Sequence, residues 1–199
     1  MDEKSFARDL IDAAYHPHGS KEEKVILEKH QLEHDSELSN IRNRSTSKGK
    51  DRVYKHKQHK KAYVVYAGTQ DSKDAATDLA LATGKEDFTP RFKNAKKLGK
   101  QVKMKYGDDN VTAIGHSLGG ALAEKSGLSN IITYNRGIGL NGLGKTVQRG
   151  THYRTGKDPI SLLSRTQKYT HSSKNIILPS SKKKGIAGLL DTHKTNYLQ

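Results

Sequence analysis

The spacing of apolar residues predicts two helices at the start of the chain. Apolar side chains recur at helical intervals in the first of them: Phe6, Leu10, Ile11 and Ala14. We therefore expect an amphipathic helix over residues 4–15. Ser20, followed three residues later by Glu23, is a capping-box pattern that predicts a second, shorter helix ending near residue 27. Residues 30–50 are polar and show no clear period, which indicates mostly loop.

The pattern changes to strands beyond residue 50. Residues 52–56 and 62–67 predict two antiparallel strands joined by a basic turn. Further elements are expected downstream: a helix carrying Ala75, Leu79 and Ala82, a long helix from Pro90 to about Gly107, and short strands at 131–134 and 151–154. After residue 160 we expect mostly basic loop with one apolar segment, 176–178. Strands that alternate with helices predict an α/β fold, with a mostly parallel sheet, an antiparallel start and helices on both faces.

The most informative stretch is 111–125, which reads VTAIGHSLGGALAEK. An apolar strand runs into the turn Gly115-x-Ser117-x-Gly119, and a plausible helix follows. Such a turn strains the serine backbone and exposes its hydroxyl, and it requires glycines where side chains would collide. The backbone N–H of Leu118 would then face negative charge forming beside the serine. A glycine-rich turn with an incidental serine is the alternative, but the run GHSLGGALA after an apolar strand favours a nucleophile.

A serine becomes an effective nucleophile when an imidazole takes its proton and a carboxylate orients that imidazole. In α/β-hydrolases the three residues occur in the order Ser, Asp or Glu, His. Asp158 is the only acidic residue between positions 125 and 190. Of the later histidines, His171 lies in a polar stretch, whereas His193 follows apolar residues that can pack on the core. Elimination therefore selects Ser117, Asp158 and His193.

Alternatives to this assignment stay open at the level of the sequence. Asp191 lies two residues before His193, a spacing that fits a local turn better than a catalytic relay. Asp158 could merely begin an Asp-Pro turn, and His193 could be a surface residue near the C-terminus.

Composition limits the other function classes. The 199 residues are expected to form one domain, with 1–50 as an N-terminal helical and loop extension. The net charge of +15 favours polyanionic partners, such as an anionic membrane surface, a nucleic acid or an acidic protein. Cysteine is absent, and no apolar run approaches a membrane span. The N-terminus lacks a secretion-signal pattern, so we expect a cytoplasmic or virion-associated protein rather than a Sec-secreted one.

Neither a metal nor a cofactor is expected. His16 and His18 flank a proline, His56 and His59 lie in a basic turn, and neither pair has a carboxylate nearby at ligand spacing. Residues 139–146 match the phosphate-loop string G-x-x-x-x-G-K-[ST]. The expected strand does not lead directly into this string and no long amphipathic helix follows it, so we discount a nucleotide site.

The chain resembles the class 3 lipases, a fungal-lipase-like branch of the α/β-hydrolases, from about residue 38 to the C-terminus. The resemblance rests on four features in order: YVVYAGTQDSKDAATDL at 63–79, the GHSLGGALA turn, Asp158-Pro159, and His193 ahead of Tyr197-Leu198. It implies an α/β-hydrolase fold, with Ser117 as nucleophile, His193 as general base and then acid, and Asp158 as its orienting partner. It also implies that Thr69 and the N–H of Leu118 hold the oxyanion.

The chain departs from that family at three places. Ala67 stands where the family has arginine, tryptophan is absent throughout, and the lid segment corresponds to the short polar stretch 83–89. The short polar lid segment argues against interfacial activation and against long triacylglycerols as substrates. Residues 37–40 resemble compact lipase-like proteins of large DNA viruses, which would add a virion-associated role.

The sequence therefore predicts a serine carboxylester hydrolase that acts on acyl esters of lipids or phospholipids. A non-catalytic protein of lipase fold, which binds nucleic acid or an assembly through its basic surface, is the alternative.

Overall fold

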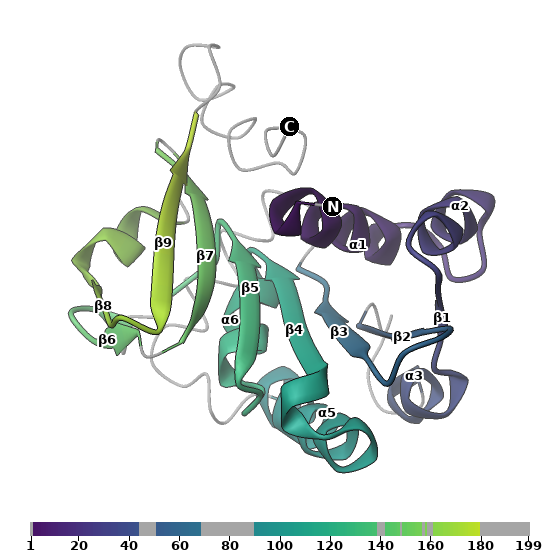
Figure 1. The fold of residues 1–199 in the computed structure, drawn as a ribbon. Coiled ribbons are helices and arrows are strands. Elements are labelled where there is room, and N and C mark those ends of the chain that lie inside the picture. The colour runs from purple at the N-terminus through teal and green to yellow at the C-terminus, as the bar shows by residue number, and fades with distance from the viewer. Residues whose placement is uncertain are drawn as a thin grey trace.

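The computed structural model of the chain describes residues 2–43, 51–68, 90–138, 142–147, 149–156, 158 and 161–179. A sheet of seven strands lies at its centre, in the order β1-β2-β3-β4-β5-β7-β9 (Figure 1). The strands are β1 (Leu32–His34), β2 (Arg52–His56), β3 (Ala62–Tyr66), β4 (Val111–His116), β5 (Asn130–Tyr134), β7 (Gly150–Thr155) and β9 (Ser173–Leu178). The first two pairings are antiparallel and the next four are parallel, which confirms the predicted topology.

Helices cover both faces of this sheet. They are α1 (Glu3–Tyr15), α2 (Lys21–Lys29), α3 (Ser36–Asn43), α5 (Pro90–Tyr106) and α6 (Leu118–Lys125). Successive strand residues point to opposite faces, so Val64 packs with α5 and α6 while Val65 packs with α1. Two short 3₁₀ helices (Asp108–Asn110 and Ser161–Thr166) and a small parallel pair, β6 (Thr146–Val147) with β8 (Lys168–Tyr169), complete the described elements. None of the described helices is long and apolar enough to cross a bilayer.

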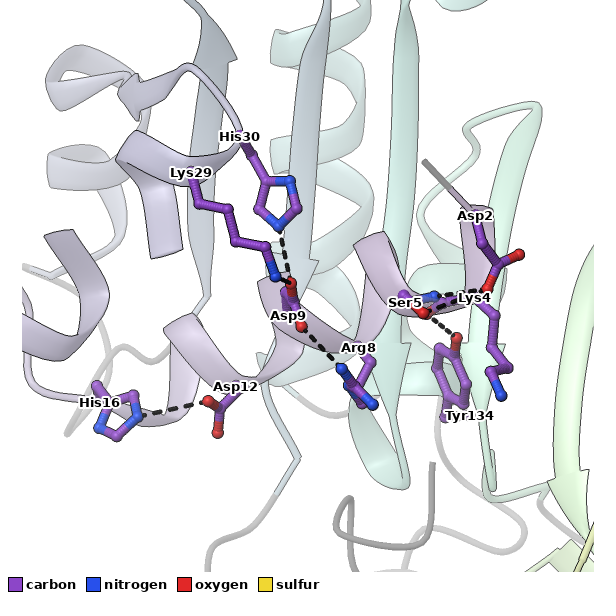
Figure 2. A network of polar contacts seen from close by, with 10 residues as sticks. All are labelled: Asp2, Lys4, Ser5, Arg8, Asp9, Asp12, His16, Lys29, His30 and Tyr134. Atoms are coloured by element: carbon purple, nitrogen blue, oxygen red, sulfur yellow. Dashed lines mark hydrogen bonds and ion pairs between the residues drawn. The ribbon is translucent and has the colours of Figure 1, made fainter. Parts of the chain in front are cut away.

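The first two helices were predicted correctly from local sequence patterns. In the predicted capping box, Ser20 Oγ accepts a hydrogen bond from the Glu23 backbone N–H at 3.2 Å. Figure 2 shows how α1 and α2 are joined: the Asp9 carboxylate accepts hydrogen bonds from Lys29 Nζ at 2.7 Å and His30 Nε2 at 2.9 Å. Burial alone would raise the pKa of Asp9, but these hydrogen bonds outweigh it and lower the pKa.

Two loop predictions are wrong. The polar stretch 30–50 contains β1 and α3, and the sheet extends beyond residue 160 through β9. A three-residue strand is too short to display a period, and β9 buries only Ser173 and Leu178, at its two ends, so neither shows a clear alternation. Backbone pairing with β2 and with β7 defines these strands instead. The helix predicted around residues 71–82 lies outside the described residues.

A buried histidine makes the sheet sensitive to acid. His152 on β7 accepts a hydrogen bond at Nδ1 from the Thr133 hydroxyl at 2.8 Å. Its Nε2–H donates to the Arg149 carbonyl oxygen at 2.9 Å, which fixes the neutral tautomer because that oxygen can only accept. Burial, with a smaller contribution from the charge of Arg136, lowers the pKa of His152 to about 4.

We predict that this histidine contributes an acid-labile part of the stability. An unfolded chain binds the proton at a pKa of about 6.5, so protonation favours unfolding as pH falls from about 6.5 towards 4. The expected loss is about 2 kcal/mol between pH 7.5 and 5. Urea unfolding of wild type and His152→Gln at several pH values measures the slope of the unfolding free energy against pH. The variant should lack the part of this slope that His152 contributes. Identical slopes would contradict the prediction.

Candidate functional site

Ser117 occupies a strained turn between β4 and α6. Its φ of 56° and ψ of −126° lie in a region that residues with side chains rarely adopt. Its backbone N–H donates to the Tyr134 carbonyl oxygen at 3.0 Å, and its own carbonyl oxygen accepts from Gly120 N and Gly137 N at 3.0 and 3.1 Å. The carboxyl end of β5 and the segment after it therefore hold the turn in place.

The two glycines of the turn are required by close backbone contacts. A Cβ on Gly115 would lie 2.2 Å from the Gly119 carbonyl oxygen, and one on Gly119 would lie 1.9 Å from the Tyr66 carbonyl oxygen. Backbone atoms cannot move aside as a flexible side chain can. Any side chain at these positions would therefore displace α6 from β3 and β4.

The hydroxyl of Ser117 is buried and unpaired. The residue is only 1% exposed, and its Oγ has no hydrogen-bond partner within the described part of the chain. Leu118 begins α6, so its N–H belongs to the first helical turn, whose donors have no intrahelical acceptor. A buried, unsatisfied hydroxyl beside the N-terminus of a helix is a costly arrangement for a structural serine, and it is the arrangement that acyl transfer uses.

Asp158 lies at the same edge of the sheet as Ser117. β4, β5 and β7 are parallel, so the turn after β4 and the segment after β7 both emerge at the carboxyl ends of the strands. Asp158 is 1% exposed, and its backbone N–H donates to Thr155 O at 3.3 Å. Asn135 Oδ1 accepts from Thr155 N at 2.8 Å and so ties the ends of β5 and β7 together. The other predicted site residues, His193 and Thr69, lie outside the described residues.

A family model described as a Tle-like phospholipase domain matches residues 8–149, which is most of the chain. The chain belongs to this phospholipase-like family. No curated protein and no solved structure matched the chain. The family assignment supports lipid ester hydrolysis in general and is coarser than the class 3 lipase resemblance. The matched residues include Ser117 and end before Asp158 and His193.

In this phospholipase-like chain, the end of α1 reaches the serine turn. The Tyr15 hydroxyl lies 3.1 Å from His116 Nδ1, and a Cβ on Gly68 would lie 3.0 Å from that hydroxyl and 3.3 Å from Ser117 Cβ. Burial raises the pKa of Tyr15 to about 12, with a backbone hydrogen bond from Gly68 opposing it, so the phenol stays protonated at neutral pH. Sequence analysis did not identify Tyr15, because helical periodicity does not show which distant loop a side chain contacts.

A second set of hydrogen bonds holds the segment after β3. Both backbone groups of Ala67 are bound: its N–H donates to Asp51 Oδ1 at 3.2 Å, and its carbonyl oxygen accepts from an Arg91 guanidinium N–H at 2.7 Å. Asp51 precedes β2, and Arg91 lies in the first turn of α5. The step from Ala67 to Gly68, directly before Thr69, is thus fixed from two sides.

Helix α6 is anchored by a buried arginine that sequence reasoning also missed. Arg136 is 2% exposed and donates to the Glu124 carboxylate and, at 2.5 Å, to Gln167 Oε1. A Cβ on Gly120 would lie 2.6 Å from Arg136 Cβ, so this arginine packs directly against the first turn of α6. The ion pair therefore fixes the helix whose N-terminus faces Ser117.

We predict that Tyr15→Phe folds normally but hydrolyses ester substrates about 3- to 10-fold more slowly, because one buried hydrogen bond of about 1 kcal/mol no longer positions His116 and Gly68. Tyr63→Phe is the matched control, since Tyr63 pairs with Thr112 near the start of β4, at the other end of the strand. Steady-state kinetics on a soluble ester measures both. Equal rates in wild type and Tyr15→Phe would contradict this role.

Proposed function

We propose that the chain is a serine carboxylester hydrolase that cleaves acyl esters of lipids through an acyl-enzyme. The observation that carries the proposal is the strained, buried and unpaired Ser117 at the turn from β4 to α6. Membership of the phospholipase-like family supports a lipid ester as the substrate class.

In the proposed reaction, Ser117 Oγ attacks the ester carbonyl carbon while His193 takes the hydroxyl proton. The negative charge on the carbonyl oxygen would be met by the N–H of Leu118 and by Thr69. Collapse of the tetrahedral intermediate breaks the ester C–O bond, and His193 returns the proton to the leaving alcohol. Water then attacks the carbonyl carbon of the acyl-enzyme while His193 takes a proton from it. Collapse of the second intermediate breaks the bond between the acyl carbon and Ser117 Oγ, releases the carboxylic acid, and returns the proton from His193 to Ser117 Oγ. Asp158 orients His193 throughout.

The basic surface is proposed to bring the enzyme to its substrate. A net charge of +15 attracts an anionic membrane, and this attraction weakens with salt because screening shortens to about 3 Å at molar ionic strength. The same charge suits the alternative, a non-catalytic component that binds nucleic acid or a virion assembly. The strained serine favours the enzyme, since such a conformation costs about 1–3 kcal/mol and gives a purely structural protein nothing in return.

We predict that Ser117→Ala abolishes ester hydrolysis by several orders of magnitude while the fold is kept, because only a hydroxyl is lost and the triad acts as a unit. Asp158→Asn should be similarly severe, and Thr69→Ala milder, about 10- to 1000-fold. Ser172→Ala is the matched control, since Ser172 is exposed in the turn before β9.

Hydrolysis of short-chain esters and of phospholipid vesicles measures these rates, with circular dichroism as the check on folding. A folded Ser117→Ala protein with wild-type activity would remove Ser117 from the reaction. Vesicle binding by all variants should stay unchanged, so that a loss of hydrolysis is assigned to chemistry rather than to recruitment.

A further inference from the structure

Three side chains that could bind a metal converge beside the start of α2. His18 lies in the turn between α1 and α2, Glu23 in the first turn of α2, and His34 at the end of β1. One ligand atom from each lies within 4.8 Å of the other two. Within the described part of the chain, this is the one such group of three.

Glu23 is held ready as an anionic ligand. The residue is fully buried, and its carboxylate accepts hydrogen bonds from Gly19 N at 2.6 Å and from the Tyr54 hydroxyl at 3.0 Å. Protein groups thus fix the orientation of the carboxylate, as outer-shell groups do around bound metals.

The two histidines share too few protons for the contacts they make. His34 Nε2 lies 2.9 Å from Glu23 Oε1 and also 2.9 Å from His18 Nδ1. A single N–H on His34 can point at one of these acceptors but not fully at both. A metal ion would instead accept the lone pairs of both imidazole nitrogens and of the carboxylate at once.

The spacing of the ligand atoms fits a small tetrahedral ion. Bonds of about 2.0–2.2 Å to nitrogen and oxygen place neighbouring ligands about 3.3 Å apart. His34 Nε2 lies 2.9 Å from His18 Nδ1 and 2.9 Å from Glu23 Oε1, and His18 Nδ1 lies 3.4 Å from the other carboxylate oxygen, Glu23 Oε2. Each of these separations is near the expected value, with the two imidazoles on different oxygens of the carboxylate, and one ligand atom from each residue lies within 4.8 Å of the others. The His18 side chain is 53% exposed, which leaves an approach from solvent and a fourth position for water.

We propose that His18, Glu23 and His34 form a binding site for a divalent transition metal of the Zn²⁺ type. Two imidazoles and one carboxylate are a ligand set that suits zinc and its neighbours rather than Mg²⁺ or Ca²⁺, which prefer oxygen ligands. The site would join three segments, the turn between α1 and α2, the start of α2 and β1.

The guanidinium of Arg52 lies beside this site. Its Nε lies 3.6 Å from Glu23 Oε1, so a positive charge of the protein faces the carboxylate before any metal ion binds. An ion held by charge alone gains little there, whereas an ion that bonds to imidazole nitrogen gains from both histidines. Arg52 repels every divalent cation alike, so the preference for a Zn²⁺-type ion over Mg²⁺ and Ca²⁺ comes from the two imidazole nitrogens.

The test is metal binding by the full-length protein, which is independent of hydrolysis. Calorimetric titration with Zn²⁺ should give one ion per chain, and Co²⁺ should give the visible absorption bands of a tetrahedral site. Mg²⁺ should not bind. Zn²⁺ at about 100 times its Kd should raise the Tm by about 5–10 °C.

His18→Ala should weaken Zn²⁺ binding by more than the ~10- to 100-fold typical for loss of an outer-shell partner, and should abolish the Co²⁺ bands. His18 is largely exposed, so its replacement leaves the fold intact. His171→Ala, which removes an exposed imidazole in the turn before β9, is the matched control and should bind as wild type does. Absence of saturable Zn²⁺ binding, or equal affinity in wild type and His18→Ala, would overturn the proposal.

Discussion

The strained backbone at Ser117 links the serine turn to the strands and the helix around it. A side chain at a φ of 56° costs about 1–3 kcal/mol, and the conformation persists only where its neighbours leave no alternative. The hydrogen bond from Ser117 N to Tyr134 O fixes the turn on one side. The contact of Gly119 with the Tyr66 carbonyl oxygen fixes it on the other, so β3, β4 and β5 must all be correctly paired for the turn to form.

Helices packed on both faces of the sheet surround the serine turn. Buried apolar side chains of α5 and α6 fill one face, and those of α1 fill the other, so that the turn lies between two packed layers. The N-terminal segment thus contributes directly to the site through Tyr15. Its own position is set by the pairing of Asp9 with Lys29 and His30 (Figure 2), which docks α2 against α1.

The sequence allowed good prediction wherever the determining contacts are local. The turn at Ser117 depends on glycines two residues away and on the strand just before it, so its pattern is visible in a dozen residues. The long α5 and the capped start of α2 were predictable for the same reason. β1 and β9 were missed because backbone pairing with remote strands defines them, and a short or edge strand carries little alternation.

Contacts between remote segments explain what could not be predicted at the site. Arg136 and Asp51 are ordinary polar residues in the sequence, and only the fold shows that they bind α6 and the segment after β3. The sequence also argued against a metal, because no carboxylate stood at ligand spacing beside His16 and His18. The fold brings Glu23 and His34 to His18 from α2 and β1, although His34 lies sixteen positions further along the chain.

The central claim is that Ser117 is an activated nucleophile. Covalent labelling of the native protein with a fluorophosphonate, followed by peptide mapping, tests it most directly, because the reagent requires an activated serine and not merely a folded chain. We expect one phosphonylated site, at Ser117, that is lost when the protein is unfolded before labelling. A native, folded protein that remains unlabelled, or that is labelled at another serine, would contradict it.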